Sequence, residues 1–147
     1  MMIRKAALFA ISLAVVASLS GCVRIAQSPY PVATATTTAG ASSNCEGKSV
    51  TLNQPGTHYE LTGSCDRVSI QGQDITVTLA SAKTFTINGD RNNVVVKSIG
   101  GLTIEGQDNG IRASVIGTLG ISGDRNSVAA SALGPKTVNG QGNSVIG

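Results

Sequence analysis

Five glycines recur at a fixed spacing of 17 residues through the second half of the chain, and each has similar neighbours. A period of this length is typical of solenoids, in which each repeat is one small structural unit that buries its apolar side against the next. The spacing therefore predicts a repeat domain. The glycines are Gly72, Gly89, Gly106, Gly123 and Gly140.

Apolar residues occupy fixed positions relative to each of these glycines. In one repeat, Phe85 and Ile87 lie four and two residues before Gly89, and Val94 and Val96 lie five and seven residues after it. A spacing of two indicates a strand with one buried face. Each repeat is expected to form a closed coil of two or three short strands, stacked on the next coil at about 4.8 Å. The predicted fold is all-β, a short parallel β-helix (β-solenoid) of five to six coils.

An asparagine follows the glycine by three residues in four of the five repeats. Glycine and asparagine both tolerate left-handed backbone, so this segment is predicted to be a tight turn. Stacked asparagines can also pass amide hydrogen bonds from one coil to the next. The first repeat has Ile75 at this place, and its turn is expected to differ. The asparagines are Asn92, Asn109, Asn126 and Asn143.

Charges alternate two residues after the glycine, where Asp74, Arg91, Asp108 and Arg125 follow one another from repeat to repeat. In a parallel, in-register stack they would form a ladder of opposite charges. An antiparallel hairpin meander is the alternative fold, and it gives no reason for the alternation.

The first 21 residues have the pattern of a signal peptide, with Arg4 and Lys5 ahead of an apolar run at 6–19. The run ends at Leu19-Ser20-Gly21-Cys22, which resembles the lipobox of bacterial lipoproteins. That resemblance implies cleavage before Cys22, a diacylglycerol on its thiol, and a lipid-anchored location on the outer face of the bacterial cytoplasmic membrane. An ordinary secretory signal with a chance cysteine is the alternative.

Residues 22–44 are rich in Ala, Thr, Ser and Pro and are expected to form a flexible linker, either unmodified or carrying O-linked sugar. The repeat domain is expected at 45–147, with a degenerate capping first coil at 45–67. In this coil Gln54 is expected to take the place of the glycine, 18 residues before Gly72. Cys45 and Cys65 are predicted to form a disulfide, because thiols oxidise outside the cytoplasm. A metal pair is the rival interpretation, and a single histidine in the chain, His58, cannot complete a four-ligand set.

The net charge of +3 falls when the signal peptide leaves, because loss of Arg4 and Lys5 reduces eleven basic residues to nine against eight acidic ones. With two Phe and two Tyr in the whole chain, few side chains are available to stack on bases. Nucleic acid is therefore not an expected partner, and no cofactor is expected.

Asp90, Asp124 and Glu105 are the acids that a small polysaccharide-acting enzyme would use. Asp90 and Asp124 share a column two coils apart, roughly 9 to 10 Å, which an inverting glycosidase tolerates. Gln107 lies between them and arginines lie beside them, so both are expected to be structural turn acids. Calcium binding is disfavoured because alternate turns carry Arg. An ice-binding threonine array is also disfavoured, because Gly120 interrupts the column.

The last repeat stops in mid-coil and leaves Val138, Val145 and Ile146 without an evident cap. An unpaired sheet edge invites pairing with another chain. Weak end-to-end self-association at the C-terminal coil is therefore expected.

The order of features resembles a known family. It consists of a lipobox, a Thr/Ala linker, a cysteine, Leu61-Thr62-Gly63-Ser64-Cys65, and repeats of the form Val/Ile-x-Gly-x-x-Asn-x-Val. Over about 44–147 this resembles the small actinobacterial secreted proteins and lipoproteins grouped as domain of unknown function 3060. The resemblance implies a surface-located repeat domain and contributes no catalytic residue.

The sequence as a whole favours a non-enzymatic envelope lipoprotein that displays a rigid solenoid for structural or binding use, with cell-wall saccharide as a partner suggested by location. The alternative is the small polysaccharide-acting enzyme described above.

Overall fold

The computed structural model describes residues 42–147. The predicted signal peptide, the predicted lipid-bearing Cys22 and most of the predicted linker lie outside the described residues. Within 42–147 no helix has the length and hydropathy needed to cross a membrane.

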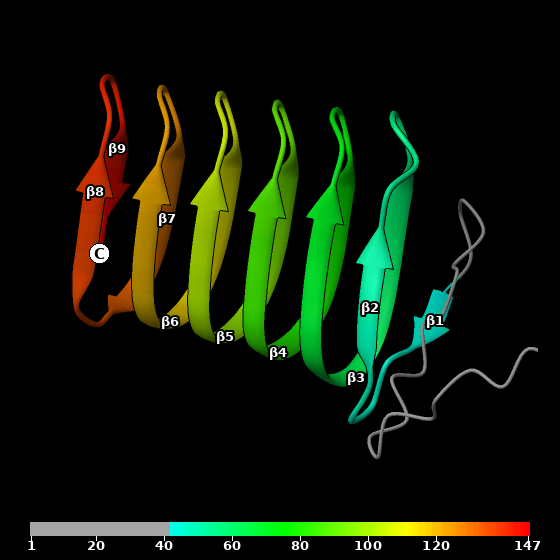
Figure 1. Ribbon diagram of the computed structural model, residues 1–147. Helices are drawn as coiled ribbons and strands as arrows, with labels where there is room; N and C mark the ends of the chain where they lie inside the picture. Colours follow the sequence, from blue (N-terminus) through cyan, green and yellow to red (C-terminus); the bar gives the residue numbers. More distant parts are fainter. Residues whose placement is uncertain (1–41) are drawn as a thin grey trace, which may run out of the picture. The chain divides into compact units, whose positions relative to one another are not determined.

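The described residues form a β-solenoid of stacked coils (Figure 1). Four long strands each make most of one coil. They are β3 (His58–Gln71), β4 (Thr76–Asn88), β5 (Asn93–Glu105) and β6 (Gly110–Ser122). Shorter strands complete the two ends. These are β1 (Ser42–Asn44), β2 (Ser49–Leu52), β7 (Ser127–Leu133), β8 (Lys136–Asn139) and β9 (Ser144–Ile146).

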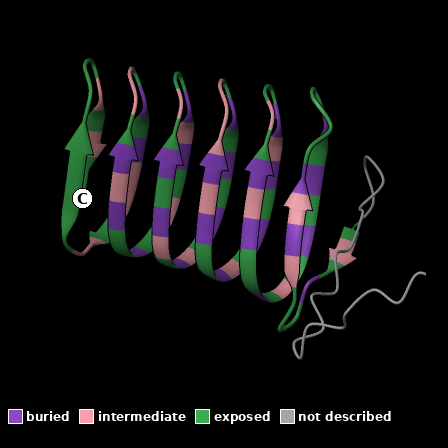
Figure 2. Ribbon diagram, in the orientation of Figure 1, coloured by how far each residue is buried: buried purple, intermediate pink, exposed green. Residues whose placement is uncertain are grey.

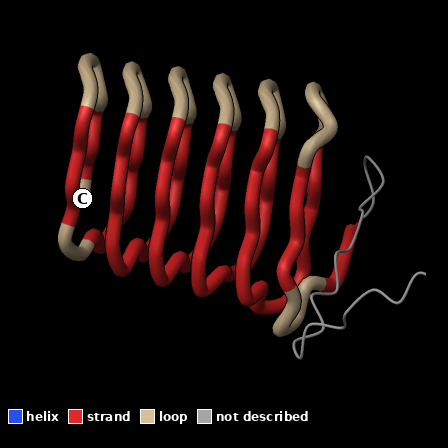
Figure 3. The backbone as a smooth tube through the Cα atoms, viewed as in Figure 1, coloured by secondary structure: helices blue, strands red, loops and turns tan. Residues whose placement is uncertain are grey.

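All the pairs between these strands are parallel, and from β4 onward they keep one register. Val77, Val94, Ile111 and Val128 are successive partners from β4 to β7 at steps of 17 residues. The predicted parallel β-helix is confirmed, and the alternative antiparallel meander is wrong. The two or three short strands expected in each coil are joined into one long strand. This strand bends through a corner and lines both faces of its coil (Figure 3).

The core is the stack of inward columns that the glycine-based count predicts. In the inner coils every second residue along each face is buried, as Phe85 and Ile87 are on one face and Val94 and Val96 on the other (Figure 2). Burying an aliphatic or aromatic side chain of this size contributes about 1.5 to 3 kcal/mol. Because each coil shields its neighbours' side chains, no single coil could bury its own columns, and the repeat must stack to be stable.

The first full coil is one residue longer than the others, as predicted. Tyr59 and Leu61 pair with residues 18 further along, and the register returns to 17 at Ser64. The extra residue forms an irregularity at Thr62-Gly63, where Gly63 has φ of 85°. The solenoid also begins earlier than predicted, since β1 occupies three residues that the sequence assigns to the linker.

Candidate functional site

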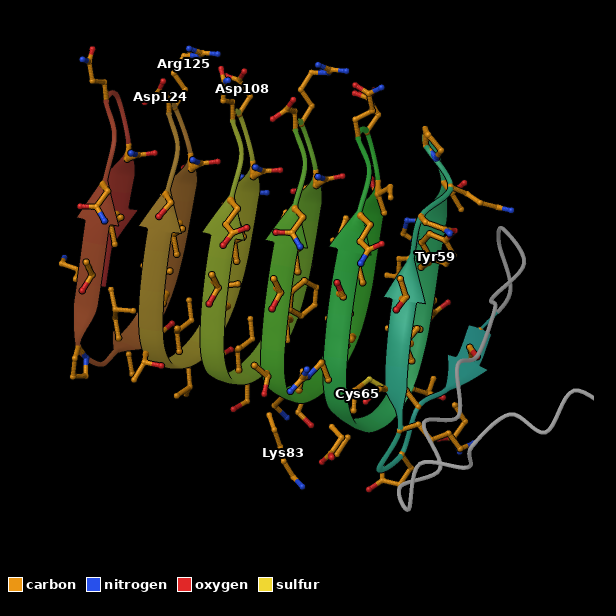
Figure 4. The ribbon with its side chains drawn as sticks, in the orientation of Figure 1. Tyr59, Cys65, Lys83, Asp108, Asp124 and Arg125 are labelled. Atoms are coloured by element: carbon orange, nitrogen blue, oxygen red, sulfur yellow. A yellow bond between two sulfur atoms is a disulfide. The ribbon has the colours of Figure 1, made fainter. Side chains whose placement is uncertain are left out.

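The tight turns stack into a ridge along one edge of the solenoid. We call this the turn ridge, and it comprises residues 72–75, 89–92, 106–109, 123–126 and 140–143. Figure 4 shows Asp108, Asp124 and Arg125 on it. Most of the polar residues that could carry chemistry lie here, so their contacts decide whether they remain available.

Asparagines form the inner side of the turn ridge. Asn109 is buried, and its Oδ1 accepts hydrogen bonds from the backbone N–H of Asn92 at 3.0 Å and from Asn92 Nδ2 at 3.1 Å. Its own Nδ2 donates to the carbonyl of Gly89 at 2.9 Å and to Asn126 Oδ1 at 3.0 Å. The same pattern joins Asn126 to Asn143. These four residues form the asparagine ladder.

The left-handed backbone lies one residue earlier than the sequence suggested. Asp74, Arg91, Asp108 and Arg125 have φ between 55° and 58°, and the asparagines do not have positive φ. The asparagine contributes the hydrogen bonds of its buried amide. Its tolerance of left-handed backbone is not used in these turns.

The first turn differs from the later ones at its glycine, as expected, because Gly72 does not have the positive φ of Gly89, Gly106 and Gly123. The residue before Ile75 is the same in conformation. Asp74 has φ of 58°, like its equivalents in later turns. Ile75 is buried at the end of the asparagine ladder, and its backbone N–H donates to Asn92 Oδ1 at 3.0 Å. An apolar side chain fits at this position because no asparagine precedes it in the stack. No side-chain amide from an earlier turn therefore has to find an acceptor here.

The predicted charge ladder is resolved into two separate bidentate pairs. Arg91 Nε lies 2.8 Å from Asp74 Oδ1, and its Nη2 donates to Asp74 Oδ2 at 3.0 Å and to Gln73 Oε1 at 2.9 Å. Arg125 makes the same three contacts one coil pair later, with Asp108 and Gln107. Each arginine therefore joins its own turn to the preceding turn, and the two ion pairs do not share a residue.

The pKa values of these groups move in the directions that pairing requires. The hydrogen bond from Arg91 is the main cause that holds the pKa of Asp74 below its ordinary 3.8, and Arg125 lowers the pKa of Asp108 in the same way. Hydrogen bonding to these acids raises the pKa values of both arginines. Both acids are thus held in the charged form, since the charged partner favours ionisation.

Two of the three acids proposed for catalysis bind backbone amides. Asp90 Oδ1 accepts the N–H of Gln107 at 2.8 Å, and Asp124 Oδ1 accepts the N–H of Gln141 at 2.7 Å. Each therefore ties its turn to the following one. Glu105, the third acid, is exposed at the end of β5, one residue before the turn ridge. His58 is exposed at the start of β3.

Cys45 and Cys65 form the predicted disulfide, with Cα atoms 4.9 Å apart. Both cysteines are buried beneath the first coil, and Glu46 Oε2 accepts the N–H of Ser64 at 2.6 Å beside them. No group of three or more His, Cys, Asp or Glu residues suited to a metal ion occurs in the described part of the chain.

A second polar surface lies on the outward side of the strands that lead into the turn ridge. Two columns of side chains stand there in register, one at the position of Thr84 and the other two residues further along. The first column contains Ser49, Arg67, Thr84, Gly101 and Thr118. The second contains Thr51, Ser69, Thr86, Thr103, Gly120 and Thr137. We call this surface the hydroxyl face.

The hydroxyl face is hollowed along the solenoid axis. One open groove of about 510 Å³ runs from Thr84 to Lys136 and Thr137, and another of about 460 Å³ runs from Ser49 and Thr51 to Thr84. Thr84 lies between the two grooves and lines both of them. Each groove has a volume in the range of ligand sites, although both are much more open to solvent than an enclosed pocket.

Sequence reasoning missed the first of these columns. It considered the second as a threonine array and set it aside because Gly120 interrupts it. The available signal was that interruption, together with Gly101 in the next column, since neither glycine belongs to the 17-residue turn pattern.

Comparison with known protein families gives one match, over part of the chain. A family model described as protein of unknown function (DUF3060) matches residues 56–98. The match supports the resemblance noted above and spans β3, β4, the first two tight turns and the first half of β5. No curated protein and no solved structure matches the chain.

Proposed function

We propose that this chain is a lipid-anchored protein of the bacterial cell envelope, outside the cytoplasmic membrane, and that its solenoid is a non-enzymatic binding or structural module. The anchor is the diacylglyceryl group proposed on Cys22, for which the support is the sequence Leu19-Ser20-Gly21-Cys22 behind a signal-like segment. The linker would carry the solenoid away from the bilayer.

One observation carries the non-enzymatic part of the proposal. The polar residues of the turn ridge are engaged in holding coils together, since Asp90 and Asp124 accept backbone amides and the arginines are clamped to Asp74 and Asp108. The hydroxyl face, in contrast, directs repeated hydroxyl groups outward. Saccharide of the cell wall is the partner proposed for it, because of the proposed location.

Fractionation tests the anchor. The native chain is expected in the detergent phase of a bacterial lysate, with the mass of a lipid-modified protein starting at Cys22. Cys22→Ser should move the chain to the aqueous phase. An unmodified native chain in the aqueous phase would reject the anchor.

A substitution test separates a binding module from an enzyme. Asp90→Asn, Asp124→Asn and Glu105→Gln together remove the candidate acids, and each new amide keeps an oxygen that can accept the same hydrogen bond. We expect retention on isolated cell-wall polysaccharide to be unchanged in this triple variant. Release of reducing ends by the native chain, lost in the triple variant, would instead establish the enzyme.

A further inference from the structure

Asparagine is followed directly by glycine at three places in the repeats, and the surroundings of the three pairs differ. Because glycine has no Cβ to obstruct the approach, its backbone nitrogen can reach the side chain of the asparagine before it more easily than that of any other residue. Attack by this nitrogen converts the asparagine to an acid, so each pair is a potential modification site. The pairs are Asn88-Gly89, Asn109-Gly110 and Asn139-Gly140.

In the two inner pairs, the glycine nitrogen is held by the neighbouring coil. The N–H of Gly89 donates to the carbonyl of Glu105 at 3.0 Å. The N–H of Gly110 donates to the carbonyl of Asn92 at 2.8 Å, and Asn109 is itself buried. Each nitrogen must leave its hydrogen bond and lose its proton before it can attack, and this requires local opening of an inner coil.

The third pair lies in the last coil of the described stack, which β8 and β9 form (Figure 1). Asn139 and Gly140 are both exposed. Within 42–147 the N–H of Gly140 has no acceptor, whereas the equivalent N–H of Gly123 donates to the carbonyl of Asn139 at 3.0 Å. β8 pairs with β6 alone, and elements at the end of a fold open at the lowest cost in free energy.

We propose that Asn139-Gly140 is a site of spontaneous deamidation, which gives the terminal coil a negative charge and an altered backbone. The Gly140 nitrogen loses its proton to solvent and attacks the side-chain carbonyl carbon of Asn139. A new N–C bond closes a succinimide ring, the C–N bond of the side-chain amide breaks, and ammonia leaves. Water then opens the ring at one of its two carbonyls and leaves aspartate or isoaspartate. The only co-reactant is water.

Isoaspartate at this position disturbs the last coil, because the chain then runs through the former side chain and gains a methylene. Asn143 lies in the turn that follows, and its Oδ1 accepts the N–H of Asn126 at 2.9 Å. An added backbone atom shifts the two turns out of match, so we expect the modified chain to lose hydrogen-bond protection in β8 and β9. The site is independent of the proposed function, since it needs neither the lipid nor a ligand.

The experiment uses the chain from residue 23 onward, because every strand pair and the disulfide of the solenoid lie within 42–147. Cooperative thermal unfolding with a β-type circular dichroism spectrum confirms folding first. The protein is then aged in warm, mildly alkaline buffer and digested with trypsin at mildly acidic pH. Cleavage after lysine and arginine places the three pairs in separate peptides, 84–91, 98–112 and 137–147. Tandem mass spectrometry measures the conversion of amide to acid in each and distinguishes Asn139 from Asn143.

In the folded chain, Asn139 is expected to convert about tenfold faster or more than Asn88 and Asn109, because the last coil opens more easily than the inner ones. The same chain, reduced and kept unfolded in urea, is the matched control. All three asparagines should convert at similar rates there, since each is followed by glycine and none is held by a coil. Equal rates in the folded chain, or the same difference between sites in urea, overturns the inference.

A substitution tests the effect on the terminal coil. Asn139→Gln keeps an exposed side-chain amide but prevents the modification, because glutamine would have to close a larger ring. Ageing should speed amide hydrogen exchange in β8 and β9 of the native chain, with β4 and β5 unchanged, and should have no such effect in Asn139→Gln. Asn88→Gln is the control variant and should age like the native chain. The same change in aged Asn139→Gln, or none in the modified native chain, would reject this effect.

Discussion

At the scale of single residues, the glycines of this solenoid are of two kinds, those that the turns require and those that the fold does not require. Gly106 has φ of 141° and faces the backbone oxygen of Gly89, whereas Gly120 lies in ordinary strand with open space beside it. A side chain at the first position meets both backbone strain and a collision. At the second it meets neither.

The two positions therefore give opposite results when changed to alanine. Gly106→Ala is expected to lower the free energy of unfolding by about 3 kcal/mol or more, since unusual backbone and overpacking each contribute in this range. Gly120→Ala should leave it unchanged or raise it by about 0.4 to 1 kcal/mol. Urea unfolding followed by circular dichroism measures both. A similar loss in the two variants would contradict this account of the turns.

Asn109 is expected to be among the least replaceable polar residues. Asn109→Ala removes the acceptor of two N–H groups of Asn92 and the donor to the Gly89 carbonyl, all in a buried place. Because an unsatisfied buried group costs about 1 to 3 kcal/mol, we expect a loss of about 3 kcal/mol in unfolding free energy.

The neighbouring Asn93 is the matched control for this prediction, because it is exposed and outside the asparagine ladder. Asn93→Ala should change the unfolding free energy by less than about 0.5 kcal/mol. Chemical denaturation of the two variants under identical conditions makes the comparison. If both alanine variants were equally stable, the ladder would have no energetic role.

At the scale of elements, the first coil is stabilised by a covalent bond, whereas the later coils are stabilised by pairing with equivalent strands. The disulfide joins Cys45, just after β1, to Cys65 within β3, across a separation of 20 residues. Without it, β1 and β2 would be attached by their pairing along β3 and by the hydrogen bonds of residues 45–48 to that strand.

Replacing both cysteines by alanine is expected to lower the unfolding free energy by about 3 kcal/mol, which is the chain-entropy value for a loop of this length. Faster amide hydrogen exchange in β1 and β2 should accompany the loss, with β5 and β6 little changed. Reduction of the native protein should reproduce the result. Unchanged stability on reduction would show that strand pairing alone fixes the first coil.

The Asp–Arg pairs of neighbouring turns predict an acid-dependent loss of stability. The pKa values of Asp74 and Asp108 are lowered in the folded chain, so their contribution is fully present above the ordinary pKa of 3.8 and is lost as pH falls through the lower folded values. The effect is expected to be small because both pairs are exposed and screened by salt.

Urea midpoints at pH 5 and below pH 3 measure this contribution. The native chain should lose more stability on acidification than a variant carrying Asp74→Asn and Asp108→Asn, and added salt should narrow the difference. An identical acid response in the two proteins would place the titrating groups elsewhere.

At the scale of the whole solenoid, the two ends of the described stack differ. At the first coil, β1 and β2 lie on β3 and the disulfide secures them. At the last, β8 pairs with β6 and β9 with β7, and each has one edge without a strand partner in the structure. Val138 is 39% exposed and Ile146 is 67% exposed at this end.

We propose weak self-association at this edge, because unpaired strand edges with apolar side chains favour pairing. Sedimentation velocity over a wide concentration range should show the weight-average mass of the chain from residue 23 onward rising with concentration. Val138→Lys with Ile146→Lys should abolish the rise, as charge on an edge opposes pairing. A constant monomer mass for the native solenoid would reject the proposal.

The sequence by itself determined the coil length, the inward columns, the parallel register and the disulfide. The first three follow from a 17-residue period, which forces equivalent side chains to stack. The disulfide was predicted separately, from the oxidising compartment expected for Cys45 and Cys65. Even the irregular coil was readable, since Val50, Tyr59 and Leu61 keep the alternation across an 18-residue step.

Only the tertiary structure decided how neighbouring coils use their polar groups. Three features depend on contacts between residues 17 apart, and a repeat pattern does not specify these contacts. They are the left-handed residue in each turn, the division of the charge ladder into two ion pairs, and the hydrogen bonds from backbone amides to Asp90 and Asp124. The groove has the same origin. Gly101 and Gly120 depart from the 17-residue glycine pattern, but they line one groove only because β5 and β6 pair side by side.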